Sequence, residues 1–232
     1  MSETPDLSTI FFYIITRGLP NTLVLTIFGL VLGFLLGLAL SLMSVYGSIE
    51  LRWVASGYEK LLRGIPILIL IYIFRWGMPG LFWYFESSLD RGLASVVLAL
   101  ALRSGAYQSQ IFRGAILSVN PGQMDAGFAL GMTRFQAFRY IVMPQALRLA
   151  VPGWSNEYAV VIKDSSFALD VGIFEMTKAA NQLTVNFPQL LTMTMVVAAI
   201  IYFLFTFPVT KFFGDRQTKK LKDLKDYGRC TA

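Results

Sequence analysis

Two long uncharged apolar runs constrain the fold of this chain more than any other feature. They cover Gly18–Ile49 and Ala179–Thr210, and charged residues bound both of them. A helix that crosses a bilayer needs about 20 apolar residues, so each run can hold one. The composition agrees, because only 15% of the residues are charged, against about 25% in typical soluble domains. We therefore expect an integral membrane protein of the all-α fold class.

Three further apolar segments lie between these runs, and each is interrupted by charged residues. They are Leu61–Phe85, Leu93–Ile116 and Leu147–Leu169. We predict a single transmembrane domain over residues 1–232, built as a helical bundle with about five spans. The predicted spans are 19–46, 61–85, 92–117, 147–170 and 188–211, with a polar loop at 120–144 and a tail at 212–232.

Two patterns near the first span leave alternatives open. Gly29, Gly33 and Gly37 recur every four residues and share one helix face. Such a face suits close contact with a neighbouring helix, although glycine is common in membrane helices in any case. Residues 7–17 could form an interfacial helix or an outer extension of the first span.

The distribution of Lys and Arg predicts the orientation in the membrane. If the loop at 120–144 is cytoplasmic, alternation of the spans places most cations on that side, including those of the Lys-rich tail. Arg17, Arg91 and Lys178 then fall outside, and Arg75 lies near the outer end of its segment. We therefore expect the N-terminus outside and the C-terminus in the cytoplasm.

The side-chain inventory disfavours several classes of function. The chain contains no histidine and one cysteine, Cys230. His-based metal sites and Ser-His or Cys-His nucleophilic pairs are thereby excluded, so we expect no catalytic residues and no metal. Nucleic acid is not an expected partner either, because most of the cations lie beside apolar segments, where membrane lipid is their neighbour.

The polar loop has the sequence signals of two short helices. Asn120 and Pro121 form a helix start, and Gly131 suits the residue that follows a helix end. Thr133 and Gln136 then have the spacing of a capping box. The second helix carries apolar residues at helical spacing, and Pro144 should end it or bend it into the next span.

Three interpretations of this helix pair compete. A DNA-binding helix-turn-helix has similar anatomy, but one held between two spans could not reach a duplex freely. A re-entrant loop would bring Asp125, Arg134 and Arg139 into lipid at high cost. A cytoplasmic docking element for a soluble partner fits best, because the pair offers an apolar side and a cationic side.

The same segment resembles the EAA motif of ABC-importer permeases. That motif is E-A-A, three residues, Gly, nine residues, Ile, one residue, Leu-Pro. This chain has Asp125-Ala126-Gly127, then Gly131, Ile141 and Met143-Pro144 in the same register. It departs from the motif at Asp125, at Gly127 and at Met143. Glycine at 127 costs about 1 kcal/mol of helix stability relative to alanine.

Other segments resemble the polar-amino-acid branch of that family. "RGIPILILIYIFRWGMP" is similar to its R-G-[TI]-P segment, and "GAYQSQIFRGAILSVNPGQ" to a segment with Glu where this chain has Gln110. "MPQALRLAVPGWSNEYAVVIKDSSF" is similar to the segment that ends in Lys-Asp-Ser/Thr-Ser. The matches cover residues 63–167, with compatible spans on both sides.

The resemblance implies a permease subunit of an ATP-driven importer in a prokaryotic cell membrane. The helix around Asp125 would dock on a cytoplasmic P-loop ATPase dimer, with Gln123, Ala126, Gly131 and Arg134 beside it. The chain has no G-x-x-x-x-G-K-[ST] motif, so ATP would be bound by that partner and no cofactor is expected here. Further implied partners are a second permease chain, identical or homologous, and an extracytoplasmic solute-binding protein.

Charged residues inside predicted spans are candidates for substrate contact. Arg103 shares a helix face with Tyr107 and Gln110, and Glu157 shares another with Asp164. A cation on one helix and carboxylates on the next suit a polar amino acid, and a basic one best. The resemblance adds Ser165 through the Lys-Asp-Ser-Ser motif. The alternative is that these charges pair with each other and only hold the helices in register.

The function that these expectations describe is the pathway subunit of an amino-acid importer. A self-contained channel or ion-coupled carrier is the alternative, but neither a pore filter nor an inverted repeat is recognisable. An intramembrane enzyme is the third possibility, and the missing histidine disfavours it.

Overall fold

The computed structural model describes residues 5–215, and all of its regular structure there is helical. Short π- and 3-10-helical turns, labelled η, join or extend several of the α-helices. The α-helices are α1 (Leu7–Tyr46), α2 (Ile49–Gly64), α3 (Ile67–Tyr72), α4 (Ser88–Leu117), α5 (Gly122–Ala129), α6 (Arg134–Ala137), α7 (Met143–Asp164), α8 (Met176–Asn186) and α9 (Leu191–Val209). The turns are η1 (Ile73–Gly77), η2 (Pro79–Phe82), η3 (Phe138–Val142), η4 (Ser165–Val171), η5 (Pro188–Leu190) and η6 (Thr210–Asp215).

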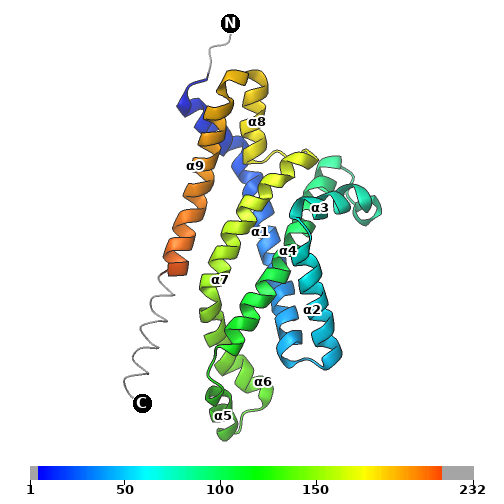
Figure 1. Cartoon of the computed structure of the whole chain (residues 1–232), viewed down its shortest axis with the longest axis vertical. Coiled ribbons are helices and arrows are strands. Elements are labelled where there is room, and N and C mark those ends of the chain that lie inside the picture. The colour runs from blue at the N-terminus through cyan, green and yellow to red at the C-terminus, as the bar shows by residue number, and fades with distance from the viewer. Residues whose placement is uncertain (1–4, 216–232) are drawn as a thin grey trace.

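The long helices run in alternating directions along the length of an elongated bundle (Figure 1). α1, α2 with α3, α4, α7 and α9 follow one another in this up-and-down order. The start of α1 and α8 lie near one end, and α5 with α6 forms the other end (Figure 1). The predicted all-α fold class is therefore confirmed, and the polar loop lies at the end opposite the start of α1.

Two helices have the length and hydropathy needed to cross a membrane. They are Leu7–Tyr46 and Pro188–Gly214, and they contain most of the two uncharged runs. Residues 7–17 belong to α1 without a break, so they extend the first helix. Asp6 caps that helix by accepting a hydrogen bond from the Thr9 amide at 3.0 Å. Hydrogen bonds from the Thr9 and Ser8 side chains, and then this backbone bond, lower the pKa of Asp6.

The helical segment that follows α1 differs from the span predicted at 61–85. It begins at Ile49 with α2, breaks at Ile65 and Pro66, and continues through α3 and η1 to Gly77. Pro66 cannot donate a backbone hydrogen bond and disfavours helical geometry at the residue before it. The amphipathic α2 buries Ala55, Glu59 and Leu62 along one face.

The remaining bounds differ by smaller amounts from expectation. α4 starts four residues before the predicted 92, and α7 ends at Asp164, where η4 continues the helical path. Pro144 does not end the helical path, because it lies in the first turn of α7, directly after the π-helical turn η3 that joins α6 to α7. The tail from 216 onwards lies outside the described residues.

The contact between α1 and α4 depends on the glycine face of α1. A Cβ atom on Gly33 would lie 2.9 Å from Gln108 Nε2, and one on Gly37 would lie 2.8 Å from Gln108 Cβ. The small residues therefore serve close helix packing, as the first of the two alternatives predicts. Gln108 is fully buried there, donates to the Leu30 carbonyl at 3.2 Å and accepts from Trp154 Nε1 at 3.0 Å. This one amide links α1, α4 and α7.

Candidate functional site

A charged cluster joins α4 to α7. The guanidinium of Arg103, in the middle of α4, forms an ion pair with the carboxylate of Asp164, the last residue of α7. It is the one ion pair found in the part of the chain that the structure describes. The two side chains retain 18% and 16% exposure, so a polar solute could still reach them. The structure thus brings together the two residues that the sequence nominated from different spans.

Tyr107 extends this cluster toward α2. The Arg103 guanidinium lies 4.9 Å from the centre of the Tyr107 ring, and that of Arg63 lies 5.1 Å from it. An aromatic face attracts a cation through its quadrupole. Tyr107 therefore holds two cations close together, one from α2 and one from its own helix. The second of them, Arg63, was not predicted to belong to the site.

Glu157 is the member of the cluster whose carboxylate lacks a hydrogen-bond partner at one oxygen. It is 4% exposed, within electrostatic reach of Arg103 and Asp164, and beside the Ser104 hydroxyl. Its Oε1 atom is buried and has no hydrogen-bond partner among the described residues. A buried carboxylate oxygen without a donor is costly, so a ligand that supplies an N–H group would stabilise this arrangement.

Ser165, which the sequence nominated, and Gln110, which shares a helix face with Arg103, form hydrogen bonds outside this cluster. Ser165 is fully buried and donates its hydroxyl to the Ile162 carbonyl at 2.7 Å. Gln110 shares a helix face with Arg103 but donates to Glu59 Oε2 at 3.1 Å, on α2. The cluster that the structure assembles is therefore Arg63, Arg103, Tyr107, Glu157 and Asp164.

Glu59 was not predicted from the sequence. This carboxylate is 3% exposed and accepts a second hydrogen bond from Ser109 Oγ at 2.6 Å. The signal was present in α2, because Ala55, Glu59 and Leu62 have the i, i+4, i+7 spacing of one helix face. An acidic residue on an otherwise apolar face indicates a buried polar contact.

The polar loop forms the helix–turn–helix that the sequence predicted. Asn120 Oδ1 accepts from the Gly122 amide at 2.9 Å, and α5 ends at Ala129. Gly131 follows with φ +76°, in the left-handed region that glycine adopts at little cost. The Thr133 and Gln136 side chains form the predicted capping box at the start of α6.

Gly127 has a structural reason to depart from alanine. It is buried, and a Cβ atom there would lie 3.0 Å from Ala137 Cβ and 3.0 Å from Ile141 Cδ1. α5 therefore packs directly against the helix that follows the turn. The loss of helix propensity at this position is offset by the close approach of the two helices.

The residues nominated for docking lie on the outside of this helix pair. Asp125, Ala126 and Gly131 are exposed, and Gln123 Oε1 accepts from Gln145 Nε2 at 3.2 Å. Arg134 stacks on the Tyr46 ring, 5.5 Å from its centre. Large apolar side chains are exposed beside them, namely Phe128, Leu130 and Phe135, so the surface has an apolar part and a cationic part.

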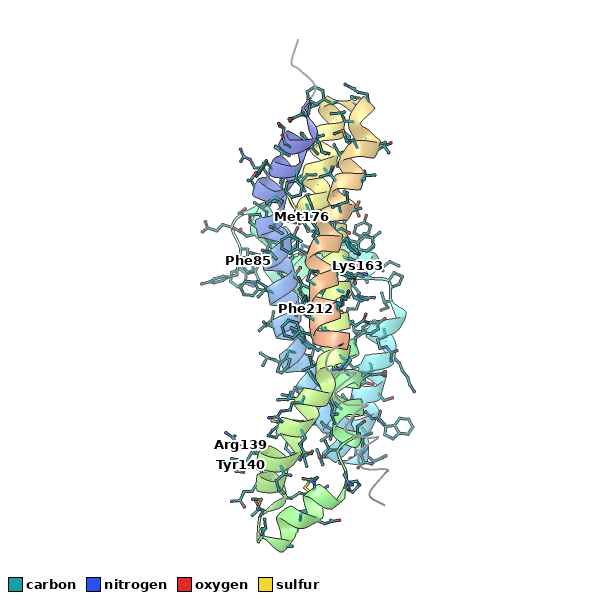
Figure 2. All side chains as sticks on the ribbon, turned by 90° about the vertical axis from the view of Figure 1, so that its left-hand side faces the viewer. Phe85, Arg139, Tyr140, Lys163, Met176 and Phe212 are labelled. Carbon is teal, nitrogen blue, oxygen red and sulfur yellow. The ribbon has the colours of Figure 1, made fainter. Side chains whose placement is uncertain are left out.

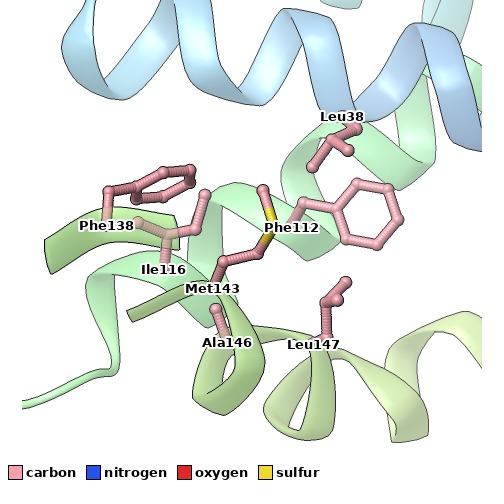
Figure 3. Close-up of a pocket in the computed structure, with 7 residues that line it drawn as sticks. All are labelled: Leu38, Phe112, Ile116, Phe138, Met143, Ala146 and Leu147. Carbon is pink, nitrogen blue, oxygen red and sulfur yellow. The ribbon is translucent and has the colours of Figure 1, made fainter. Parts of the chain in front are cut away.

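The base of the loop is fixed to the bundle. Figure 3 shows Phe112 and Ile116 of α4 facing Met143 and Leu147 of α7, with Leu38 of α1 above them. The gap between these side chains is about 10 Å³, too small for a solute. Since α6, η3 and α7 form one helical path, a displacement of the loop would be carried directly into α7.

Comparisons with known proteins agree with this anatomy. The family described as "Binding-protein-dependent transport system inner membrane component" matches residues 29–222. The L-cystine transport system permease protein TcyB of Bacillus subtilis is 35% identical over 198 residues, covering 85% of this chain and 82% of that protein. The octopine transport system permease protein OccQ of Rhizobium radiobacter is 34% identical over 220 residues and 92% of each chain. A crystal structure of an amino acid ABC transporter with histidines superposes with a TM-score of 0.75 at 29% identity, covering 89% of this chain and 94% of that one.

Proposed function

Because the chain belongs to the family of binding-protein-dependent transport system inner membrane components, we propose that it forms the translocation pathway of an ATP-driven amino-acid importer. As a member of this family it is a permease subunit and not itself an enzyme. The observation that carries the proposal is the charged cluster of Arg103, Glu157 and Asp164 between α4 and α7. The proposed substrates are polar amino acids, with a preference for those with a basic side chain.

Each charge of the cluster has a role toward such a substrate. Arg103 would bind the α-carboxylate, and to do so it must exchange its bond to Asp164 for one to the solute. Asp164 is then free to accept the α-ammonium group. The unpartnered Oε1 of Glu157 would accept a basic side chain, which accounts for the preference. The names of the relatives, which refer to cystine and octopine, support an amino-acid substrate.

The exchange of ion pairs explains how binding of the solute could be sensed. In the structure α4 and α7 are joined by Arg103 and Asp164. A solute that binds both Arg103 and Asp164 replaces their direct contact, so that α4 and α7 are then linked through the solute. Only a solute with both an anionic and a cationic group can satisfy the two residues at once, so the cluster would select zwitterions.

The coupling role belongs to the helix–turn–helix at the other end of the bundle. We propose that α5 docks on a separate cytoplasmic P-loop ATPase dimer through Gln123, Asp125, Ala126, Gly131 and Arg134, with Phe128 and Leu130 as apolar contacts. Movement of the ATPase would displace α5 and, through α6 and η3, the helix α7 that carries Asp164. ATP would be bound by the partner, and this chain would need no cofactor.

The remaining parts of the proposal concern the assembly. A second permease chain, identical or homologous, would complete the pathway, and an extracytoplasmic solute-binding protein would deliver the solute. The N-terminus would lie outside and the C-terminus in the cytoplasm, which agrees with the position of α5 and α6 at the end opposite the start of α1 (Figure 1).

The test begins with a mild-detergent purification of the tagged chain from native membranes, with partners identified by mass spectrometry. A stoichiometric P-loop ATPase and ATP-dependent uptake of labelled arginine by the reconstituted complex are the expected results. A chain that purifies only with itself, and takes up solute without ATP, would favour a channel or ion-coupled carrier instead. Uptake of glutamate in preference to arginine would contradict the proposed preference for basic side chains but not the importer function.

A further inference from the structure

A second cationic site lies on the bundle away from the charged cluster and the loop. It is a pocket of about 110 Å³ lined by Arg75, Pro79, Phe82, Arg91 and Ser95. Its walls are η1 and η2 on one side and the first two turns of α4 on the other. The first residues of α4 lie at the end of this helix that is remote from α5 and α6 (Figure 1). The pocket therefore lies toward the predicted outer side of the membrane.

The guanidinium of Arg75 lies at this pocket, and only some of its hydrogen-bond donors have an acceptor. Its Nη2 atom donates to Ser88 Oγ at 3.0 Å, in the first turn of α4. Its Nε atom is buried and has no hydrogen-bond partner among the described residues. The Nε atom lies against α4 beside Gly92, at 3.7 Å from the position that a Cβ atom would take there. One guanidinium N–H is therefore positioned in the protein without an acceptor.

The charge of the pocket is also uncompensated. Neither Arg75 nor Arg91 forms an ion pair within the described residues, and no acidic residue lines the pocket. The amino terminus of α4 adds a partial positive charge at the same place. The nearby acids Glu86 and Asp90 are exposed. Two guanidinium groups beside a helix amino terminus form an anion-binding arrangement.

The size of the pocket and the sign of its charge limit the ligand. A volume of about 110 Å³ holds about three or four water molecules at ~30 Å³ each, which suits a carboxylate with one or two methylene groups. A free zwitterionic amino acid would bring its ammonium group close to two guanidinium groups, and like charges repel. A side-chain carboxylate of another protein carries no such cation.

The surroundings of the pocket fit a protein partner. Trp76, Trp83, Tyr84 and Phe85 are exposed on the segment that forms one wall, and Figure 2 shows Phe85 projecting sideways from the bundle. Trp, Tyr and Arg are the residue types that contribute most to binding at protein interfaces. A pocket for one acidic side chain, bordered by exposed aromatic rings, matches that pattern.

We propose that the pocket of Arg75 and Arg91 binds the side-chain carboxylate of an Asp or Glu residue on the extracytoplasmic solute-binding protein. The identity of the partner rests on the proposed function, whereas the carboxylate chemistry rests on the pocket. The site differs from the substrate cluster, because Arg91 and Arg103 are separated by about 18 Å along α4 at 1.5 Å per residue.

The experiment measures the affinity of the solute-binding protein for the complete importer in nanodiscs of phosphatidylcholine. The test variants are Arg91→Gln and the double variant Arg75→Gln/Arg91→Gln. Arg17→Gln is the matched control, since Arg17 is an exposed cation on the same predicted side but outside the pocket. We expect the double variant to bind at least tenfold more weakly and the control to stay within twofold of the wild type.

A small carboxylate tests the chemistry directly. Sodium N-acetylaspartate, compared with sodium chloride at equal ionic strength, should weaken binding of the partner to the wild-type importer and leave the double variant unaffected. ATP hydrolysis without the binding protein should be unchanged in every variant. A complex that lacks the ATPase altogether would contradict the proposed function. Normal ATP hydrolysis together with a changed affinity for the solute-binding protein would leave the proposed function intact and test only the role of the pocket.

Three outcomes would overturn the proposal. The first is equal affinity of the partner for the wild type and the double variant. The second is a higher KM for the transported amino acid with unchanged partner affinity, which would assign the carboxylate to the solute. The third is a difference between variants that arises only in nanodiscs containing phosphatidylglycerol, which would assign the pocket to a lipid phosphate.

Discussion

Arg103 on α4 and Asp164 at the end of α7 form an ion pair across 61 residues of sequence. Both side chains are mostly buried, yet both remain accessible to a polar solute. Breaking such a pair without replacement is costly, because a partly desolvated charge is left alone. The pair can therefore open at low cost only when a solute supplies the missing charges, and this requirement underlies the first two predictions.

Replacing Asp164 by Asn should abolish most transport while leaving the complex assembled. Asn keeps the size of the side chain but cannot carry the negative charge that an ammonium group needs. Loss of a charge-assisted hydrogen bond of about 1.5–3 kcal/mol predicts a decrease in uptake of about tenfold or more. Uptake of labelled arginine into proteoliposomes measures the effect. Asp170→Asn, at an exposed position of η4, is the control, and equal uptake in both variants would rule out the substrate role.

Exchanging the two charges separates a substrate role from a purely structural one. The double variant Arg103→Asp/Asp164→Arg retains an ion pair between α4 and α7, so its melting temperature should recover relative to either single variant. Uptake should stay at least tenfold below wild type, because the carboxylate and ammonium groups of the solute would meet like charges. If the exchange restores uptake as well as stability, the pair only holds the helices together.

Replacing Gly131 by Leu should weaken the association with the ATPase. Gly131 has φ +76°, and an L-residue in this region costs about 1–2 kcal/mol. Gly172→Leu is a matched control, since Gly172 has φ +85° and also has open space around it, but lies after α7. Co-purification of the ATPase should fall with Gly131→Leu only. Similar losses in both variants would indicate a general defect in folding.

Introducing Glu at position 110 should destabilise the protein. Gln110 Nε2 donates to Glu59 Oε2 at 3.1 Å, so Gln110→Glu would place a second carboxylate, at an exposed position, in contact with the buried carboxylate of Glu59. We expect a loss of about 2 kcal/mol, seen as a lower midpoint in thermal unfolding. Adding Glu59→Gln restores one amide and one carboxylate and should recover most of the loss. Failure of this second change to rescue would show that the contact is not what couples the two positions.

Substituting Gly37 by Leu should disrupt the packing of α1 on α4. A Cβ atom at this position would already lie 2.8 Å from Gln108 Cβ and 2.9 Å from the Ser109 amide nitrogen. Overpacking of this kind costs about 1–3 kcal/mol or more, so the yield of folded protein and its melting temperature should both fall. Gly57→Leu on α2 should be neutral, because nothing lies within 4 Å of a Cβ atom there. A neutral Gly37→Leu would mean that the two helices can separate freely.

Local sequence signals predicted the parts of the protein that local physics decides. The uncharged runs indicated membrane-length helices, because lipid leaves the backbone no other partner than itself. Gly131 and the Thr133–Gln136 box marked the helix–turn–helix, because helix ends are governed by residues within one turn. The four-residue spacing of Gly29, Gly33 and Gly37 placed them on one face, and helical periodicity alone is enough for that.

Tertiary structure decided which charges meet. Sequence spacing put Arg103 and Gln110 on one face of α4, but only the packing of α2 against α4 turned Gln110 toward Glu59. It also joined Arg63 to Tyr107 and buried Ser165, whose hydroxyl donates to the Ile162 carbonyl. The predicted span at 61–85 is interrupted at Pro66, and the helix before this break, α2, begins at Ile49. Hydropathy did not predict this division. Periodicity fixes a residue's face, whereas its partner depends on the helices that pack there, and those contacts join residues far apart in the chain.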